Sequence, residues 1–522
     1  MQVTGDLLIG GQAVQGAGVP AHSMNPATGQ ALAPEWRGAD AAQVDQAVRL
    51  AQEAFLVYRN ISLTERAAFL EKAADRVEGL GDALINRAMQ ETGLPQARLR
   101  GELGRTVNQL RLFADVVRRG DWLGVRIERA LPDRKPMPRS DIRLRRIPVG
   151  PVTVFGASNF PLAFSVAGGD TASALASGCP VLVKAHSAHL GTSELVGRAI
   201  VAAVQECGLP PGVFALLTGP GSEIGMQLVR HPLVKAVAFT GSRQGGMALV
   251  RVAAARPEPI PVFAEMSSVN PVFLLPGALQ ARAEQTAQGF VTSLTGSAGQ
   301  LCTNPGLVIG VRGPDFQRFI DAVVEQVCAS APGTMLTAGI HRAYQAGVQA
   351  LQDHAQVCIL ARGRDVQGVN QCQASVALTS AAAFLADPDG LGAEVFGAST
   401  LLIECDGLDD MIAIARALEG QLTATLHGQT ADDNVWMKAL LPELELKAGR
   451  ILANGFPTGV EVCHAMVHGG PFPATSDARS TSVGTMAIDR FLRPVCYQDV
   501  PQGVLPGALQ DGNPWGVMQR EF

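Results

Sequence analysis

Cys302 is the residue whose neighbours point most directly to chemistry. It lies in Ser297-Ala298-Gly299-Gln300-Leu301-Cys302-Thr303-Asn304, between a helix-like stretch at 283–295 and an apolar run at 307–311. Small and polar neighbours would leave the thiol accessible to a substrate. A lone cysteine is a candidate nucleophile, but a buried, inert cysteine fits the same pattern. This segment alone leaves both interpretations open.

Two carboxylates lie in apolar surroundings. Glu265 ends the run Val262-Phe263-Ala264 and precedes Cys302 by 37 residues. An acid on an apolar strand is costly unless it is paired or used, and burial would raise its pKa toward that of a general base. Glu394, in Glu394-Val395-Phe396-Gly397, is the second isolated acid.

Polar and glycine-rich loops follow several apolar runs. Asn159 follows Val152–Phe155, and its amide could donate to an oxyanion or simply form a turn. Lys184 follows 181–183 and could reach a ribose or phosphate, although a surface lysine fits equally. A later segment, Gly219-Pro220-Gly221-Ser222-Glu223-Ile224-Gly225, departs from G-x-G-x-x-G by one residue and is a weak dinucleotide signal.

A fourth loop opens a helix. In Phe239-Thr240-Gly241-Ser242 a strand-like run ends and a helical pattern begins, and backbone amides at a helix N-terminus suit a pyrophosphate. The runs at 152–155, 181–183, 213–217, 234–239 and 272–275 alternate with helical segments. This spacing predicts βαβ units and a parallel sheet, which binds ligands beyond the carboxyl ends of its strands.

The flanking segments predict further elements. Helices are expected from about Asp40, from the capping box formed by Ser62 and Glu65, and over 96–118; we expect their charged faces to be solvated. The stretches 141–149 and 483–497 read as strands at sheet edges, pairing with each other or with another subunit.

Composition excludes several classes. The 522 residues suffice for two or three domains, and the nine cysteines form no CxxC pair or zinc-type cluster, which predicts a reducing compartment and no metal. A net charge of −5 without a basic run argues against nucleic acid. The start lacks a signal-peptide pattern, and no long apolar span exists, so we expect a cytoplasmic protein that does not cross a membrane.

The order of these motifs resembles that of the aldehyde dehydrogenase superfamily over nearly the whole chain. The resemblance is carried by Asn25-Pro26-Ala27-Thr28-Gly29, Ser158-Asn159-Phe160-Pro161, Lys184, Phe239-Thr240-Gly241-Ser242, Glu265, Cys302 and Glu394-Val395-Phe396-Gly397. It implies an α/β fold with a Rossmann-type cofactor domain (1–127 and 147–262), an α/β catalytic domain (263–470), and oligomerisation strands with a C-terminal extension (128–146 and 483–522). It also implies a homodimer or homotetramer.

The resemblance assigns roles to the candidate residues. Cys302 would attack an aldehyde, Asn159 and the Cys302 N–H would hold the oxyanion, and Glu265 would activate the water that hydrolyses a thioester. The cofactor, NAD or NADP, would be held by residues in the strand-end loops: Lys184, Ser187, Gly221, Gly225, Gly241, Ser242, Glu394 and Phe396. Phe160 and Phe164, on a helix after Asn159, and Phe456 would line the substrate pocket.

Departures from the family pattern narrow the expectation. Ser187 stands where many NAD-dependent members have an acid that would repel a 2′-phosphate, so we expect NADP to be preferred or accepted. Arg243 and His186 are further candidates for binding the 2′-phosphate. The segments 156–162, 184–189, 299–303 and 467–477 resemble the 2-oxoglutarate semialdehyde (2,5-dioxopentanoate) dehydrogenase branch. The alternatives are an NADP-dependent dehydrogenase of fatty or other aliphatic aldehydes and a non-catalytic relative.

Overall fold

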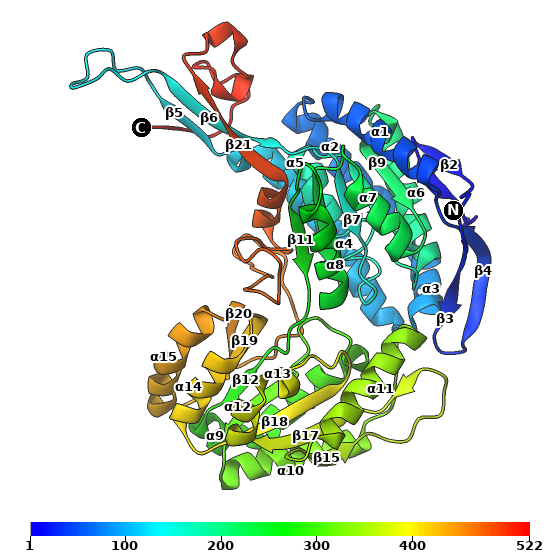
Figure 1. Ribbon diagram of the computed structural model, residues 1–522, viewed down its shortest axis with the longest axis vertical. Coiled ribbons are helices and arrows are strands. Elements are labelled where there is room, and N and C mark those ends of the chain that lie inside the picture. Colours follow the sequence, from blue (N-terminus) through cyan, green and yellow to red (C-terminus); the bar gives the residue numbers. More distant parts are fainter. Residues whose placement is uncertain (1) are drawn as a thin grey trace.

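The first of two α/β lobes is built on a seven-stranded sheet in the order β11-β10-β7-β8-β9-β1-β2. A computed structural model describes residues 2–522 and places this lobe at the top of Figure 1. Five of its strands run parallel, and the hairpin β1–β2 pairs antiparallel to β9. The strands are β1 (Leu7–Ile9), β2 (Gln12–Val14), β7 (Val152–Phe155), β8 (Val181–Lys184), β9 (Phe214–Leu217), β10 (Ala236–Thr240) and β11 (Val262–Glu265).

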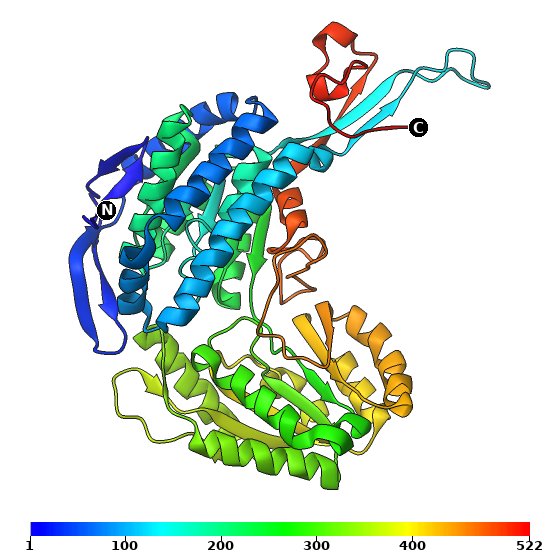
Figure 2. The same ribbon diagram turned by 180° about the vertical axis from the view of Figure 1, so that it is seen from behind.

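Helices cover both faces of this sheet, as the two opposite views in Figures 1 and 2 show. Asp40 and Ser62 form the N-terminal capping boxes of α1 and α2, which confirms both predicted helix starts. The predicted helix at 96–118 is α4. The helices of the lobe are α1 (Ala41–Tyr58), α2 (Leu63–Glu78), α3 (Gly81–Thr92), α4 (Gln96–Arg119), α5 (Gly169–Ser177), α6 (Leu190–Glu206), α7 (Met226–Arg230) and α8 (Arg243–Ala254).

The second lobe contains another seven-stranded sheet, in the order β15-β17-β18-β13-β12-β19-β20. Only β15 is antiparallel to its neighbour. Its strands are β12 (Val272–Leu274), β13 (Leu307–Val311), β15 (Cys358–Arg362), β17 (Ser375–Ser380), β18 (Ser399–Cys405), β19 (Gln421–His427) and β20 (Ala448–Ala453). Its helices are α9 (Pro276–Thr295), α10 (Pro314–Ala329), α11 (Ala338–Asp353), α12 (Ala381–Ala386), α13 (Pro388–Leu391), α14 (Leu408–Ala417) and α15 (Ala431–Glu445). Apolar clusters lie on both faces of the sheet.

A four-stranded sheet, β21-β6-β5-β22, projects from the first lobe (Figure 1). It consists of β5 (Val125–Glu128), β6 (Ile142–Pro148), β21 (Leu492–Gln498) and β22 (Gln519–Glu521). The predicted pairing of the two amphipathic stretches is confirmed, but two details were wrong. β6 is interior rather than an edge because β5 covers its other side, and residues 485–491 form a 3-10 helix, so the strand begins only at Leu492.

Two short sheets complete the strand list: β3 (Pro20–Asn25) with β4 (Gln30–Arg37), and β14 (Gly333–Thr334) with β16 (Gln371–Cys372). The predicted domain boundaries stay predictions. Strand pairing nevertheless places residues 125–127 in the projecting sheet and residues 263–265 in the sheet of the first lobe. The connection from β11 to β12 therefore links the two lobes. Glu265, the last residue of β11, lies at the start of this connection.

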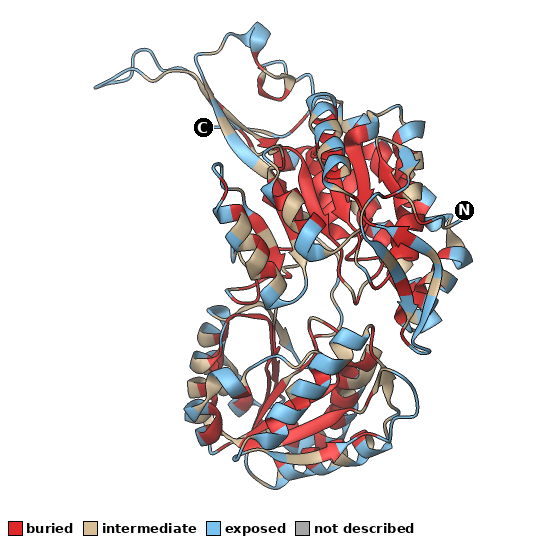
Figure 3. Cartoon of the chain, turned by 45° about the vertical axis from the view of Figure 1, so that its right-hand side comes forward, coloured by how far each residue is buried: buried red, intermediate tan, exposed pale blue. Residues whose placement is uncertain are grey.

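Burial is concentrated in the two main sheets and the helices packed on them, whereas the projecting sheet is largely intermediate or exposed (Figure 3). The polar candidates Asn159, Lys184 and Glu265 are buried at 7%, 8% and 3% exposure. A buried polar group needs a partner, so the contacts of these three side chains carry information about function. Within residues 2–522 no helix is long and apolar enough to cross a membrane.

Candidate active site

The site lies at the point where the strand order of the first sheet reverses. The chain proceeds outward from β7 through β8 to β9 and then returns to place β10 on the other side of β7. Open parallel sheets bind ligands in the crevice outside the carboxyl ends of such strands. A cavity of about 470 Å³ opens there and extends to the second lobe. Its lining includes nine predicted residues: Asn159, Lys184, Gly221, Gly241, Ser242, Glu265, Cys302, Glu394 and Phe396.

The loop before β13 holds Cys302 in a constrained conformation. Ser297, Ala298 and Gly299 have φ of 56°, 57° and 68°. The left-handed region costs a non-glycine residue roughly 1–2 kcal/mol. At Gly299 a side chain is excluded, because a Cβ would lie 2.2 Å from the Ala398 backbone nitrogen. The strained turn therefore needs support from its surroundings to present the thiol to the cavity.

Asn270 supplies part of that support. It is fully buried at φ 49°, and its Nδ2 donates to the backbone oxygens of Cys302 and Asn304, at 2.9 Å each. Its Oδ1 accepts from the hydroxyls of Ser268 and Thr423 at 2.9 and 3.0 Å. The side chain thus ties the cysteine loop to β19 and to the segment after β11.

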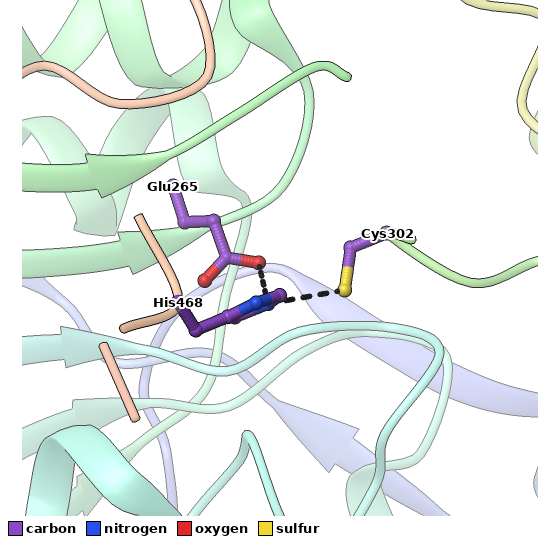
Figure 4. Close-up of side chains that lie close together, drawn as sticks. All are labelled: Glu265, Cys302 and His468. Atoms are coloured by element: carbon purple, nitrogen blue, oxygen red, sulfur yellow. Dashed lines mark hydrogen bonds and ion pairs between the residues drawn. The ribbon is translucent and has the colours of Figure 1, made fainter. Parts of the chain in front are cut away.

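His468 lies between the thiol and the carboxylate, as Figure 4 shows. Its Nε2 is 3.0 Å from Glu265 Oε1 and 3.4 Å from Cys302 Sγ. Ser482 donates to the other carboxylate oxygen, Oε2, at 2.5 Å. The imidazole is fully buried, so these contacts are made out of bulk solvent, where charge interactions are stronger.

These contacts reverse the expected behaviour of the base. Burial raises the pKa of Glu265, but the charge of His468 and the hydrogen bonds from His468 and Ser482 outweigh it, so the pKa lies below its ordinary value. The prediction of a raised pKa was therefore wrong. For Cys302, burial first and the Glu265 charge second raise the pKa of the thiol well above its usual range. The thiol is the resting form unless a positive charge stabilises the thiolate.

Asn159 and the Cys302 backbone lie on one side of the thiol loop. Asn159 Nδ2 donates to the Gln300 oxygen at 3.0 Å, which fixes the amide beside the cysteine segment. Its own backbone oxygen accepts from Arg98 Nη2 at 2.5 Å. Among residues 2–522, the Cys302 N–H has no acceptor. One amide hydrogen of Asn159 and this N–H therefore stay available for an oxyanion.

The cofactor candidates divide into those at the cavity and those outside its lining. Ser242 caps α8 by accepting from the Gly245 N–H at 3.2 Å, which leaves the first amides of the helix facing the cavity.

Two charged candidates at the cavity have shifted pKa values. Burial lowers the pKa of Lys184 to about 8. Glu394 is exposed as a residue, but burial of its carboxyl group raises the pKa to about 8. Ser187 is exposed, and neither it nor Gly225 lines the cavity. Gly225 instead packs under Phe155, whose ring a Cβ would meet at 2.8 Å.

The predicted substrate-pocket residues also divide. Phe160 and Phe164 form an edge-to-face pair with centroids 5.2 Å apart, and Phe164 lies 6.1 Å from the His468 ring. They belong to a series of turns, since α5 begins only at Gly169, so the expected helix after Asn159 was wrong. Phe456 packs against Phe290 and His427 at 6.0 and 4.9 Å. None of the three phenylalanines belongs to the lining of the cavity.

Two arginines that stack on these phenylalanines were not predicted from the sequence. The guanidinium of Arg98 stacks on Phe160 at 4.8 Å, and that of Arg105 on Phe164 at 5.0 Å. Both belong to α4, whose charged face was expected to be solvated. Arg98 and Arg105 are seven residues apart, so they lie on one side of the helix. Buried positions of α4 such as Leu99, Glu102 and Thr106 lie on neighbouring parts of that side, and this pattern could have indicated that the two arginines face the protein interior.

This combination of a nucleotide-type crevice, a half-buried thiol, a carboxylate and oxyanion donors defines a dehydrogenase that works through a cysteine. Comparisons agree: the sequence model "Aldehyde dehydrogenase family" matches residues 14–471, so the chain belongs to that family. It is an NAD(P)-dependent oxidoreductase acting on aldehydes, and members of the family are typically oligomeric.

Two relatives span nearly the full length. An alpha-ketoglutaric semialdehyde dehydrogenase 2 of Azospirillum brasilense is 58% identical, covering 99% of this chain and 98% of its own. An alpha-ketoglutaric semialdehyde dehydrogenase of Acinetobacter baylyi is 49% identical, covering 98% and 96%. Among solved structures, a lactaldehyde dehydrogenase superposes with a TM-score of 0.82 at 20% identity, covering 95% and 99%. A Thermus 1-pyrroline-5-carboxylate dehydrogenase with bound NAD gives 0.80 at 20%, covering 94% and 92%. These structures confirm the predicted fold.

Proposed function

We propose that this protein oxidises 2-oxoglutarate semialdehyde (2,5-dioxopentanoate) to 2-oxoglutarate with NAD(P) as electron acceptor. The observation that carries the proposal is the 58% identity over 99% of the chain to a relative that bears this activity in its name, together with the thiol-imidazole-carboxylate arrangement at the crevice. The same motifs at 156–162 and 467–477 supported this branch from the sequence.

Cys302 acts as the nucleophile. Its Sγ forms a bond to the aldehyde carbon, and the carbonyl oxygen becomes an oxyanion beside Asn159 Nδ2 and the Cys302 N–H. Donors fixed in place before the reaction stabilise such an oxyanion strongly, and loss of one costs about 10²- to 10³-fold in rate. Loss of a hydride from the resulting thiohemiacetal leaves a thioester on Sγ.

His468 and Glu265 handle the protons. A proton gained by His468 places a positive charge between the Glu265 carboxylate and the Cys302 thiolate, two anions that burial would disfavour. In the neutral form whose Nε2 carries no hydrogen, His468 can take the thiol proton at the start of the cycle, and the new N–H then lies within reach of both Sγ and Oε1. Glu265 then accepts a proton from the water that attacks the thioester, and the carboxylic acid and free thiol are regenerated.

The crevice fits a dinucleotide. A Cβ at Gly221 would meet nothing within 4 Å, so the loop leaves open space beside the helix N-terminus of α8. Lys184 is buried and, within residues 2–522, forms no ion pair, which is costly unless a ligand supplies the partner. Lys184 and Glu394 would hold riboses, Gly241 and Ser242 the pyrophosphate, and Phe396 would pack beside the nicotinamide. When bound, NAD(P) supplies the hydride acceptor.

We further propose that the enzyme accepts or prefers NADP as its cofactor. Ser187 is exposed after β8, where a hydroxyl tolerates a 2′-phosphate that an acid would repel. Arg243 is a weaker candidate, since Glu419 already pairs with both of its Nη atoms at 2.9 and 3.0 Å. The protein is further proposed to form a homodimer or homotetramer through the projecting sheet, whose edge strand β21 leaves backbone groups free to pair.

A substrate panel tests the proposal. Reduction of NADP would be followed with 2-oxoglutarate semialdehyde, glutaraldehyde and aldehydes of eight to twelve carbons. The proposal expects the highest kcat/KM for the semialdehyde. A preference for the long-chain aldehydes would favour the alternative of a fatty aldehyde dehydrogenase, and a wild-type protein no more active than Cys302→Ala would indicate a non-catalytic relative.

A further inference from the structure

Two arginines of α4 stack on Phe160 and Phe164, near the His468 ring, and have part of their hydrogen-bonding capacity unused. Arg98, Glu102 and Arg105 are spaced by four and three residues, which places them on one face of the helix. The charges of both arginines act on Cys302, and that of Arg105 also acts on Glu265. α4 therefore brings positive charge into the surroundings of Cys302.

Arg105 has the freer guanidinium. Its Nε and Nη2 are buried and have no hydrogen-bond partner among the described residues. Nε and Nη2 form one edge of the guanidinium plane, and two parallel N–H groups on such an edge match the two oxygens of a carboxylate. Leaving buried charged donors unpaired is costly, so an unfilled bidentate edge indicates a ligand of complementary charge.

The neighbouring groups do not fill that edge. Glu102 Oε1 accepts from the Leu162 and Ala163 N–H groups at 2.8 and 2.9 Å. Its Oε2 lies 3.9 Å from Arg98 Nη2 and forms no ion pair with Arg105. Glu461 acts on Arg105 through its charge but is exposed, and it is not within ion-pairing distance. Arg98, Arg105 and Glu102 together carry one net positive charge, which one carboxylate would neutralise.

Two other arginines near the site are already engaged. Arg98 donates Nη2 to the Asn159 backbone oxygen and stacks on Phe160, so it positions the oxyanion residue. Arg450, whose charge also interacts with Cys302, donates both Nη atoms to the oxygens of Gly459 and Pro457 at 2.7 and 2.6 Å. Arg105 alone of the three combines a stacked, fixed plane with a free edge.

We propose that Arg105 binds the carboxylate at the far end of the aldehyde substrate, with Phe164 holding its guanidinium plane in place and Arg98 adding positive charge. The inference rests on the proposed function, since a 2-oxo acid semialdehyde carries a carboxylate at the end opposite its aldehyde. It assigns the discrimination between charged and uncharged aldehydes to one side chain of a helix in the first lobe.

The experiment compares 2-oxoglutarate semialdehyde with pentanal, an uncharged aldehyde of the same carbon number, in the full-length enzyme with NADP. In Arg105→Gln, the ratio of kcat/KM for the two substrates is expected to fall about 10- to 100-fold through KM, the loss of a charged hydrogen-bond pair. Arg105→Lys should keep part of the ratio. Arg100→Gln, on the exposed face where Arg100 pairs with Asp82, serves as the matched control and should keep it.

The outcomes separate the two claims. A wild-type enzyme that shows no preference for the semialdehyde over pentanal would contradict the proposed function. A wild-type preference that persists in Arg105→Gln within twofold would contradict the anchor alone. An equal loss for both substrates in Arg105→Gln and Arg105→Lys would also overturn it, because it would indicate a structural role. The inhibition constant of the product 2-oxoglutarate gives an independent readout and should rise in Arg105→Gln.

Discussion

The Nε2 of His468 lies 3.0 Å from the Glu265 carboxylate, with the two side chains 0% and 3% exposed. The same nitrogen is 3.4 Å from Cys302 Sγ, so one buried imidazole contacts both the nucleophile and the base. A residue from the segment after the second lobe thus completes a site whose other two members come from the ends of β11 and the loop before β13. The chemistry of thiol and carboxylate is coupled through it.

Replacement of His468 by glutamine should slow the first chemical step. Glutamine can hydrogen-bond but carries no charge, so the thiolate loses its stabilising partner, and kcat/KM should fall about 10²- to 10⁴-fold. Alkylation of Cys302 by iodoacetamide, followed on its peptide by mass spectrometry, should slow in parallel. His464→Gln, at an exposed position nearby, is the control. An unchanged alkylation rate in His468→Gln would remove the imidazole from thiol activation.

Replacement of Glu265 by glutamine should separate the two halves of the reaction. The amide cannot accept a proton from water, so thioester hydrolysis should become rate-limiting. Stopped-flow absorbance should then show a burst of NADPH close to one equivalent per site, followed by a steady state that is slower by about 10²-fold or more. Full steady-state activity without a burst would assign water activation to another group.

The lowered pKa of Lys184 should make cofactor binding depend on pH. Burial lowers the pKa of this lysine to about 8, so its charge is present below that pH and is lost above it. The affinity of the free enzyme for NADP should therefore weaken as the pH rises through about 8. Titration by fluorescence quenching would measure it. In Lys184→Arg, whose charge persists, the dependence should flatten; the same dependence in both proteins would exclude Lys184 as its source.

Ser187→Glu should change cofactor preference. The added carboxylate would repel a 2′-phosphate, and for this exposed position we expect NADP to weaken by roughly fivefold or more relative to NAD. NAD measured in the same protein is the internal control. If the KM ratio of the two cofactors stayed the same, other groups would have to select between them.

Replacement of Asn270 should lower the stability of the protein, and a comparison of two variants separates lost hydrogen bonds from backbone strain. Asn270→Ala removes buried bonds to the Cys302 loop and keeps a side chain at positive φ, so unfolding free energy should drop by about 2–4 kcal/mol and activity should fall. Asn270→Gly relieves the backbone strain but loses the same bonds. Denaturant melts that are equal for the alanine variant and wild type would mean that the loop does not depend on Asn270.

Much of this site could be predicted from the sequence because its parts lie at the ends of regular elements. The strand-end loops placed Asn159, Lys184 and Ser242 at one crevice, since the carboxyl ends of parallel strands share an edge of the sheet. Capping residues Asp40 and Ser62 fixed helix starts for the same local reason. Elements with strong local signals were therefore found within a few residues.

What could not be predicted depends on contacts between distant segments. His468 lies 166 residues from Cys302, and nothing in its own segment indicates that its ring inserts beside Glu265. The contacts with His468 and Ser482, which are distant in the sequence, lower the pKa of Glu265 against the effect of burial, which is why the expected direction was wrong. Arg105 was read as surface charge because the residues that bury it, the turns around Phe164, lie on another element.

The covalent state of Cys302 during turnover is the most direct test of its role as the nucleophile. Glu265→Gln would be mixed with NADP and 2-oxoglutarate semialdehyde, quenched with acid, digested and examined by mass spectrometry. We expect a 2-oxoglutaryl thioester on the Cys302 peptide and on none of the other eight cysteines, with NADPH formed in equal amount. NADPH formation with an unmodified Cys302, or with the acyl group on another cysteine, would contradict it.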